Sequence, residues 1–170
     1  MPEAPKTPGI ARAKSDRARE VQEIFAQNYM DYQYKFVEFF VEHLEDMSRA
    51  FRGDLQQMMV LAIIGQVKLR VVRAAVLAGD DPATIPLERC GISASRIADV
   101  TVIPRQTVRR KLEILEQRGW IERLEDSTWM LRYQDGVAEA RVGLSDVDQR
   151  AIDRVARLFA DLEALVSKRS

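Results

Sequence analysis

Apolar side chains recur at alternating spacings of three and four between residues 20 and 51, and no proline interrupts them. The recurring positions are Phe25, Tyr29, Tyr32, Phe36, Phe39 or Phe40, Leu44, Met47 and Phe51. This period predicts one long amphipathic helix over residues 20–51. At about 1.5 Å per residue the helix would be about 45 Å long, which is longer than a single small domain needs for its own core.

A second helix is predicted from Leu55 to Leu77, because Gly53 and Asp54 end the first helix and Asp54 can cap the next one. The first half of this helix is apolar on most of its circumference, which indicates a central, well-covered position. The Gly-Asp-Asp-Pro sequence that begins at Gly79 ends it.

Two shorter helices follow. Ser93 can cap a helix that ends near Val100. Pro104 fits the first turn of another helix, where its missing N–H costs nothing. That helix is predicted to run to Arg118 and to be closed by Gly119.

The remaining segments predict a small β-hairpin and a last helix. Residues 120–124 and 128–133 have strand composition and flank a polar turn, and residues 137–142 are a candidate third strand. Ser145 begins the last helix, whose apolar residues keep near-heptad spacing, a pattern that favours a partner helix. These residues are Val147, Ala151, Val155, Leu158, Leu162 and Leu165. The fold class expected is therefore mainly α with a small β-hairpin.

Composition indicates one domain of ordinary globular type. The 170 residues include 46% apolar residues, and 26 acidic residues balance 26 basic ones. Net neutrality gives no bulk electrostatic argument for nucleic acid, so any such binding must come from a local patch. Residues 20–60 carry eight acidic and three basic side chains, whereas residues 104–111 carry four basic and no acidic ones. Positive charge is concentrated on the helix that Pro104 begins.

The sequence predicts a basic disordered tail over residues 1–19, where prolines interrupt the chain, and a single domain over residues 20–170. No membrane span is expected, because the most apolar window, from Met58 to Leu77, contains charged side chains. With Cys90 as the only cysteine, no intrachain disulfide can form, and a reducing cytoplasm is the expected compartment.

The sequence lacks the sets of residues that known kinds of catalytic and metal site require. Cys90 and His43 are each alone, so neither a transition-metal site nor a Cys/His nucleophile pair is predicted, and no enzyme activity or cofactor is expected. A buried or half-buried thiol is favoured for Cys90 over a redox sensor, and interface packing over a sensing role for His43. The aromatic side chains of residues 29–40 fit core or interface packing better than a ligand cavity.

The basic helix has two different faces. At about 100° per residue, Val108, Leu112 and Leu115 fall in one sector, and the opposite side carries Gln106, Arg109, Arg110 and Glu113. Arginine and glutamine are suited to guanine and adenine edges in the major groove of DNA. Arg105, Gln106 and Arg109 are predicted to reach base edges, while Arg110 could read bases or contact phosphate.

Other polar residues nearby suit phosphate contacts. Ser93, Ser95 and Thr107 can donate hydrogen bonds to phosphate, and Arg123 and Arg132 of the hairpin can contact the DNA backbone. The alternative is a solvated basic face, with Glu113 and Glu116 pairing with its arginines or with Lys111 along the same helix.

The spacing of the segment ISASRIADVTVIPRQTVRRKLEILEQRGWIER, residues 92–123, favours DNA binding. It resembles the winged helix-turn-helix of bacterial transcriptional regulators, and its place between N- and C-terminal helices resembles the MarR family. The resemblance implies dimerisation helices over residues 20–80 and 145–168, flanking a DNA-binding winged helix over residues 92–133. It also implies a homodimer on a pseudo-palindromic double-stranded DNA site, and a small-molecule effector.

Three features depart from that family. Val102 stands where its turn usually has glycine, Pro104 stands where a Ser or Thr cap is common, and the hairpin turn, with Glu125 and Asp126, is acidic. Acidic side chains at this turn disfavour its insertion into the minor groove. The alternative function is a winged helix that serves protein contact without sequence-specific DNA binding.

Overall fold

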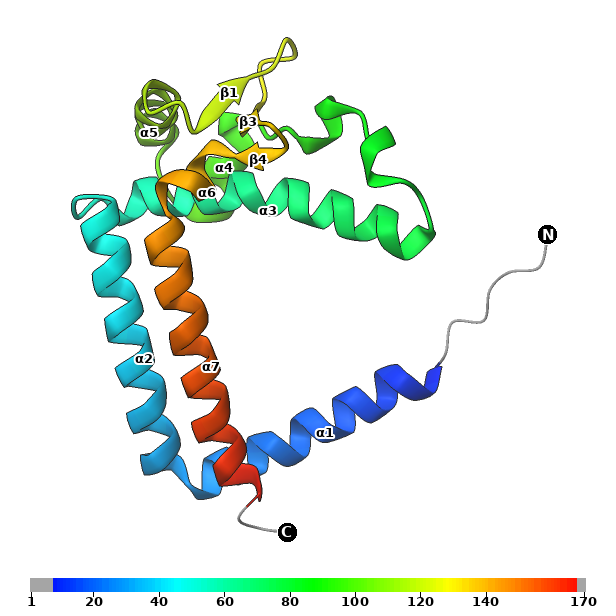
Figure 1. Ribbon diagram of the computed structural model, residues 1–170, viewed down its shortest axis with the longest axis vertical. Helices are drawn as coiled ribbons and strands as arrows, with labels where there is room; N and C mark the ends of the chain where they lie inside the picture. The colour runs from blue at the N-terminus through cyan, green and yellow to red at the C-terminus, as the bar shows by residue number, and fades with distance from the viewer. Residues whose placement is uncertain (1–7, 168–170) are drawn as a thin grey trace, which may run out of the picture. The chain divides into compact units, whose positions relative to one another are not determined.

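The computed structural model describes residues 8–167 (Figure 1). These residues form seven α-helices and four short strands, which confirms the mainly α class with a small β component. The chain divides into two compact units: residues 45–149, and residues up to 44 together with those from 150 onward. Each unit is described by itself.

The central helix of the 45–149 unit is α3, Leu55–Ala78, close to the predicted span. The Asp54 carboxylate accepts a hydrogen bond from the Gln57 N–H at 3.0 Å and caps the first turn. Gly79 ends the helix with a φ of 81°, a left-handed conformation that suits glycine. Two short 3₁₀ segments follow, η1 Pro82–Thr84 and η2 Leu87–Cys90.

Two helices joined by three residues come next, α4 Ala94–Thr101 and α5 Arg105–Gln117. The Ser93 hydroxyl accepts a hydrogen bond from the Arg96 N–H at 3.2 Å, so Ser93 is the cap that the sequence predicted. Pro104 directly precedes α5 instead of lying in its first turn. Gly119 follows the end of α5 with a φ of 71°, as a glycine after a helix end commonly does.

Two antiparallel hairpins follow α5. In the first, β1 Ile121–Arg123 pairs with β2 Trp129–Leu131 and places Arg123 opposite Trp129. Ile92, just before α4, forms an isolated bridge with Trp129, with N···O distances of 3.0 and 2.9 Å. This bridge holds the start of α4 beside the hairpin.

The predicted third strand over residues 137–142 is wrong for most of its length. β3 Tyr133–Gln134 and β4 Val137–Ala138 pair around a tight turn in which Asp135 and Gly136 have positive φ values of 51° and 79°. Then α6, Glu139–Gly143, begins. The helical turn buries Ala140 in the core and sets Gly143 against the Trp120 ring, where a Cβ would lie 2.9 Å from a ring carbon.

The core of this unit lies between α3, α4, α5 and the first hairpin, and α3 packs against α4, α5 and β2 (Figure 1). The side chains at its centre are almost completely shielded from water. They include Val60, Ile64, Ile97, Val108, Leu112, Leu115 and Ile121. All but one of these seven lie on helices, and three belong to α5.

The other unit contains α1 Pro8–Gln27, part of α2 Tyr29–Ala50 and most of α7 Ser145–Ser167. The single helix predicted over residues 20–51 is divided at Asn28, a turn residue that separates α1 from α2. The Ile24 carbonyl accepts hydrogen bonds from both the Asn28 side-chain amide, at 2.8 Å, and the Asn28 N–H, at 3.0 Å. Residues 8–19, expected to be a disordered tail, are helical in α1. Residues 1–7 lie outside the described part of the chain.

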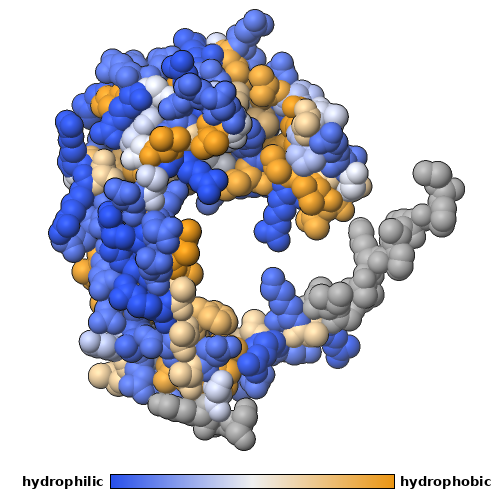
Figure 2. Space-filling model, viewed as in Figure 1, coloured by the Kyte–Doolittle hydropathy of each residue, from blue (hydrophilic) through white to orange (hydrophobic). Residues whose placement is uncertain are grey.

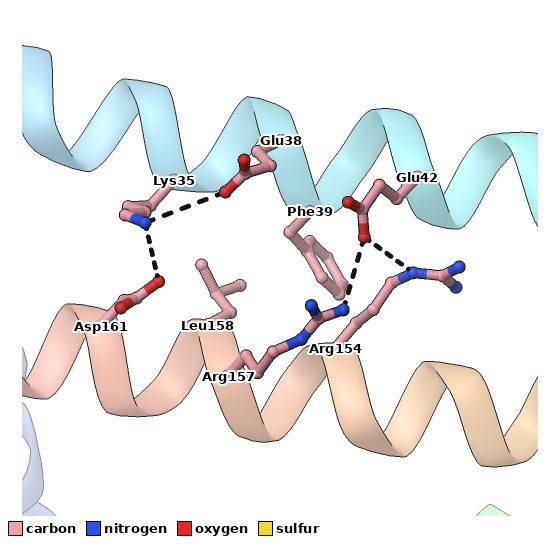
Figure 3. Close-up of a pocket in the computed structure, with 8 residues that line it drawn as sticks. All are labelled: Lys35, Glu38, Phe39, Glu42, Arg154, Arg157, Leu158 and Asp161. Carbon is pink, nitrogen blue, oxygen red and sulfur yellow. Dashed lines mark hydrogen bonds and ion pairs between the residues drawn. The ribbon is translucent and has the colours of Figure 1, made fainter.

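A ladder of charged side chains joins α2 to α7 in antiparallel register (Figure 3). The Lys35 ammonium lies 3.1 Å from the Asp161 carboxylate, and the Arg154 Nε lies 3.0 Å from the Glu42 carboxylate. Lys35 and Glu42 are seven residues, or about two helical turns, apart on α2, and Arg154 and Asp161 have the same separation on α7. The two ion pairs therefore lie about two turns apart along both helices, which run in opposite directions. The hollow between α2 and α7 is lined by these oppositely charged side chains, which pair with each other.

Large apolar side chains remain at the surface of α2 and α7. On α2 they include Met30, Tyr34, Val37 and Val41, and on α7 they are Ile152, Val155 and Phe159. Figure 2 shows hydrophobic surface on α7 and on the C-terminal half of α3, where Leu69, Val76 and Leu77 are exposed. Of the near-heptad apolar positions predicted for the last helix, Val155 is exposed, Val147 is buried and the other four are half-buried.

Candidate nucleic-acid interface

Helix α5 buries one face and exposes its basic face, as its sequence predicted. Val108, Leu112 and Leu115 are buried in the core. The side chains of Arg105, Gln106, Arg109 and Arg110 are exposed, and Thr107 is half-buried. Apolar packing therefore fixes the helix, while the polar side chains of its first two turns stay accessible to a ligand.

The exposed side chains do not all point the same way. At about 100° per residue, Gln106 and Arg110 lie within about 30° of the direction opposite the buried face. Arg109 is turned from that direction by about 90°. It borders a hollow shared with the start of α4 and the first hairpin. Gln106 and Arg110 are consequently the outermost polar residues of the helix.

Lys111, one of the four basic residues of this segment, faces the protein interior. Its ammonium lies 2.5 Å from an Asp54 carboxylate oxygen, and only 9% of its side chain is exposed. Partial burial alone would raise the pKa of Asp54, but hydrogen bonds from Lys111 and the Gln57 N–H outweigh that effect and lower it. Lys111 therefore anchors α5 to the start of α3 and adds no charge to the exposed face.

The remaining basic side chains of α5 have few partners in the protein. Arg105 lies 3.7 Å from Asp99, and both side chains are more than half exposed, so this pair contributes about 0–1 kcal/mol to stability. Within residues 8–167, Arg109 and Arg110 form no ion pair with Glu113 or Glu116. The intrahelical pairing considered as an alternative from the sequence is absent from this part of the chain.

The hollow beside Arg109 has a volume of about 370 Å³. It is lined by Ser93, Ala94, Ser95, Arg109, Leu112, Glu113, Arg123, Ser127 and Trp129. The bridge between Ile92 and Trp129 places the start of α4 against the hairpin, and the β1–β2 pairing holds Arg123 next to Trp129. The Arg123 guanidinium lies 5.9 Å from the centre of the Trp129 ring.

All but one of the predicted site residues fall into two groups. Ser93, Ser95, Arg109 and Arg123 meet around this hollow, and Arg105, Gln106, Thr107 and Arg110 occupy the first two turns of α5. Arg132 does not join either group. Its Nη1 lies 3.9 Å from the position of a Cβ built on Gly119, which follows the C-terminal end of α5.

Sequence reasoning did not assign Ser127 or Trp129 to this surface. Ser127 has a φ of 64° in the turn of the hairpin, and Trp129 forms part of the floor of the hollow. The cross-strand pair of Arg123 and Trp129 could have been inferred from a hairpin with a three-residue turn. Its position beside α4 depends on the bridge to Ile92, for which the sequence has no local signal.

The two residues with a possible sensing chemistry lie elsewhere. Cys90 is buried at the end of η2, as predicted. His43 stacks on Phe39 with ring centres 5.8 Å apart, and its Nδ1 is buried without a hydrogen-bond partner. Across residues 8–167 no three His, Cys, Asp or Glu side chains gather in a way that could hold a metal ion.

None of the helices in the described part of the chain is both long enough and apolar enough to cross a bilayer. Comparison with models of protein families, with curated proteins and with solved structures finds no match to this chain.

Proposed function

We propose that this chain is a DNA-binding transcriptional regulator of the winged helix-turn-helix type, which acts in the cytoplasm as a homodimer on a pseudo-palindromic site. One observation carries the proposal: the N-terminal half of α5 exposes three arginines and a glutamine above a buried apolar face. In a helix-turn-helix, this end of the second helix enters the major groove. The order of α4, α5 and the first hairpin is consistent with such a winged helix and supports the proposal.

Gln106 and Arg110 are the best placed to read bases, because they project away from the core. An arginine can bind guanine O6 and N7 together, and a glutamine can bind adenine N6 and N7, each for about 1–3 kcal/mol of discrimination. Arg105, at the start of α5, can turn to the DNA from Asp99 at little cost, since that pair is exposed.

The turn of the first hairpin argues against insertion into the minor groove. Hydrogen bonds from the Thr128 hydroxyl and the Thr128 N–H lower the pKa of Asp126, so this carboxylate is charged at neutral pH. Glu125 precedes it. Two negative charges at the turn would oppose an approach to phosphates, which leaves Arg123, on the strand, for contact with the DNA backbone.

Exposed apolar side chains support the homodimer. An apolar groove with a volume of about 570 Å³ follows α2, and its wall includes Met30, Tyr34, Val37 and Val41. Large exposed apolar patches mark interaction surfaces, and a second copy of the chain would bring a second α5 to the DNA. The sequence resemblance also suggests a small-molecule effector, which ligand-induced loss of DNA binding would reveal.

A winged helix that binds another protein is the alternative. The salt dependence of binding separates the two functions, because each phosphate contact releases counterions. Fluorescence anisotropy of a labelled random duplex with the purified full chain should show affinity that falls steeply with salt. An absence of DNA binding at low salt would contradict the proposal and favour the protein-contact function.

A further inference from the structure

Two arginines from different elements border the hollow between α4, α5 and the first hairpin, and neither is neutralised there. Arg109 extends from the second turn of α5, and Arg123 comes from β1. Within residues 8–167, neither guanidinium forms an ion pair. The hydroxyl groups of Ser93, Ser95 and Ser127 belong to the same rim.

We infer that this hollow holds one phosphate of the DNA backbone and that Arg109 is an anchor in it, not a reader of bases. The inference rests on the proposed function and assigns Arg109 a different role within it. When α5 enters the major groove, the base edges lie in front of Gln106 and Arg110. The sugar-phosphate strand at the groove edge then runs along the flank of α5, between the helix and the hairpin, where Arg109 and Arg123 lie.

The shape of the hollow favours a phosphate over a base edge. Its floor is closed by the buried side chains of Leu112 and Trp129, which offer no hydrogen bonds to a base edge except through the indole N–H. Its rim has two guanidinium groups and three hydroxyls, the donors that bind phosphate oxygens.

Glu113 is the one acidic side chain on the hollow, and it opposes a phosphate. It lies one turn after Arg109 on the same helix, without forming an ion pair with it. Two arginines against one glutamate leave a net positive charge around the hollow. Glu113→Gln should therefore strengthen binding to random DNA, a result that a base-reading surface would not require.

The test measures equilibrium binding of the full chain to a random duplex at several salt concentrations. Arg109→Ala and Arg123→Ala should each weaken binding by at least about tenfold. Each should also reduce the slope of log K against log salt by about 0.9, the loss of one phosphate contact. Arg110→Ala, one residue from Arg109 on the same helix, should weaken binding to a selected site more than binding to random DNA. Arg141→Ala, an exposed arginine of α6, should change neither.

A duplex in which single phosphates of the selected site are replaced by neutral methylphosphonates identifies the anchored phosphate. One replacement should weaken the wild type and have little further effect on Arg109→Ala or Arg123→Ala. The inference is overturned if Arg109→Ala lowers affinity only for the selected site while the salt slope is unchanged, because Arg109 would then read bases and the proposed function would stand. If the wild type binds no DNA, the proposed function and this inference fail together.

Discussion

Replacing Val102 by glycine should stabilise the protein. Val102 follows α4 with φ 59° and ψ 11°, a left-handed conformation that is a genuine outlier for a β-branched residue. Its side chain is 96% exposed, so it gains almost nothing from packing in exchange for that strain. The turn between α4 and α5 needs this conformation whichever residue occupies the position.

The expected gain follows from two opposing effects. A left-handed conformation costs a non-glycine residue about 1–2 kcal/mol, which Val102→Gly removes. The greater conformational entropy of glycine in the unfolded chain lowers the stability by about 0.5–1 kcal/mol. The net gain is about 0.5–1 kcal/mol, which for a chain of this size corresponds to a rise in Tm of about 1–4 °C.

Thermal unfolding followed by circular dichroism, together with urea denaturation, measures the difference. Val102→Asn should give part of the gain, because asparagine tolerates the left-handed region, whereas Val102→Ala should stay close to the wild type. If Val102→Gly were no more stable than Val102→Ala, backbone strain at this turn would not be the relevant quantity and the reasoning would be refuted.

Three further predictions concern assembly, pH and packing. Sedimentation at micromolar concentration should give a species of twice the 19.4 kDa chain mass. Because Phe159 is an exposed apolar side chain, Phe159→Glu should shift this species toward the monomer, and a monomeric wild type would refute the prediction. Asp54→Asn keeps a good cap but leaves the buried lysine of α5 unpaired, so it should cost about 1–3 kcal/mol at pH 7 in urea denaturation. Because the pKa of Asp54 is lowered in the folded protein, the difference in stability between the wild type and Asp54→Asn should be present above about pH 4 and disappear as pH falls through that pKa. A stability difference that stays constant with pH would contradict the pairing. Gly91→Ala should cost about 1–3 kcal/mol of stability, because its Cβ would lie 2.8 Å from the Thr128 Cβ. Gly65→Ala, within α3, should instead stabilise the protein, because its Cβ would meet only the Leu131 side chain, at 3.6 Å. Equal changes in the free energy of unfolding for the two variants would contradict this packing argument.

Much of the helical framework could be predicted because its ends are set by local chemistry. Asp54, Gly79, Ser93 and Gly119 cap or terminate helices through their own side chains or backbone conformations. The division at Asn28 was not predicted, because the apolar period continues through it.

The strand predicted over residues 137–142 failed for a different reason. Its composition is compatible with a strand, but Ala140 becomes buried and Gly143 meets Trp120 only if the chain turns into a helix after Ala138. Those contacts join segments that are far apart in the sequence, so the local sequence pattern does not predict the helical turn.

The candidate site was predictable in residue type and only partly in orientation. The buried and exposed faces of α5 follow from its period. Whether a basic side chain points outward, into a hollow or into the core depends on its neighbours in space: Lys111 meets Asp54, and Arg109 borders the hairpin. Arg132 lies at the opposite end of α5 because β2 runs antiparallel to β1.

Selection of bound sequences from a random DNA pool with the purified full chain tests the central claim most directly. The account predicts enrichment of an inverted repeat, and it predicts that Arg110→Ala enriches the same repeat with one base position per half-site relaxed. Enrichment of no motif by the wild type, or an unchanged motif for both Arg110→Ala and Gln106→Ala, would contradict sequence reading by α5.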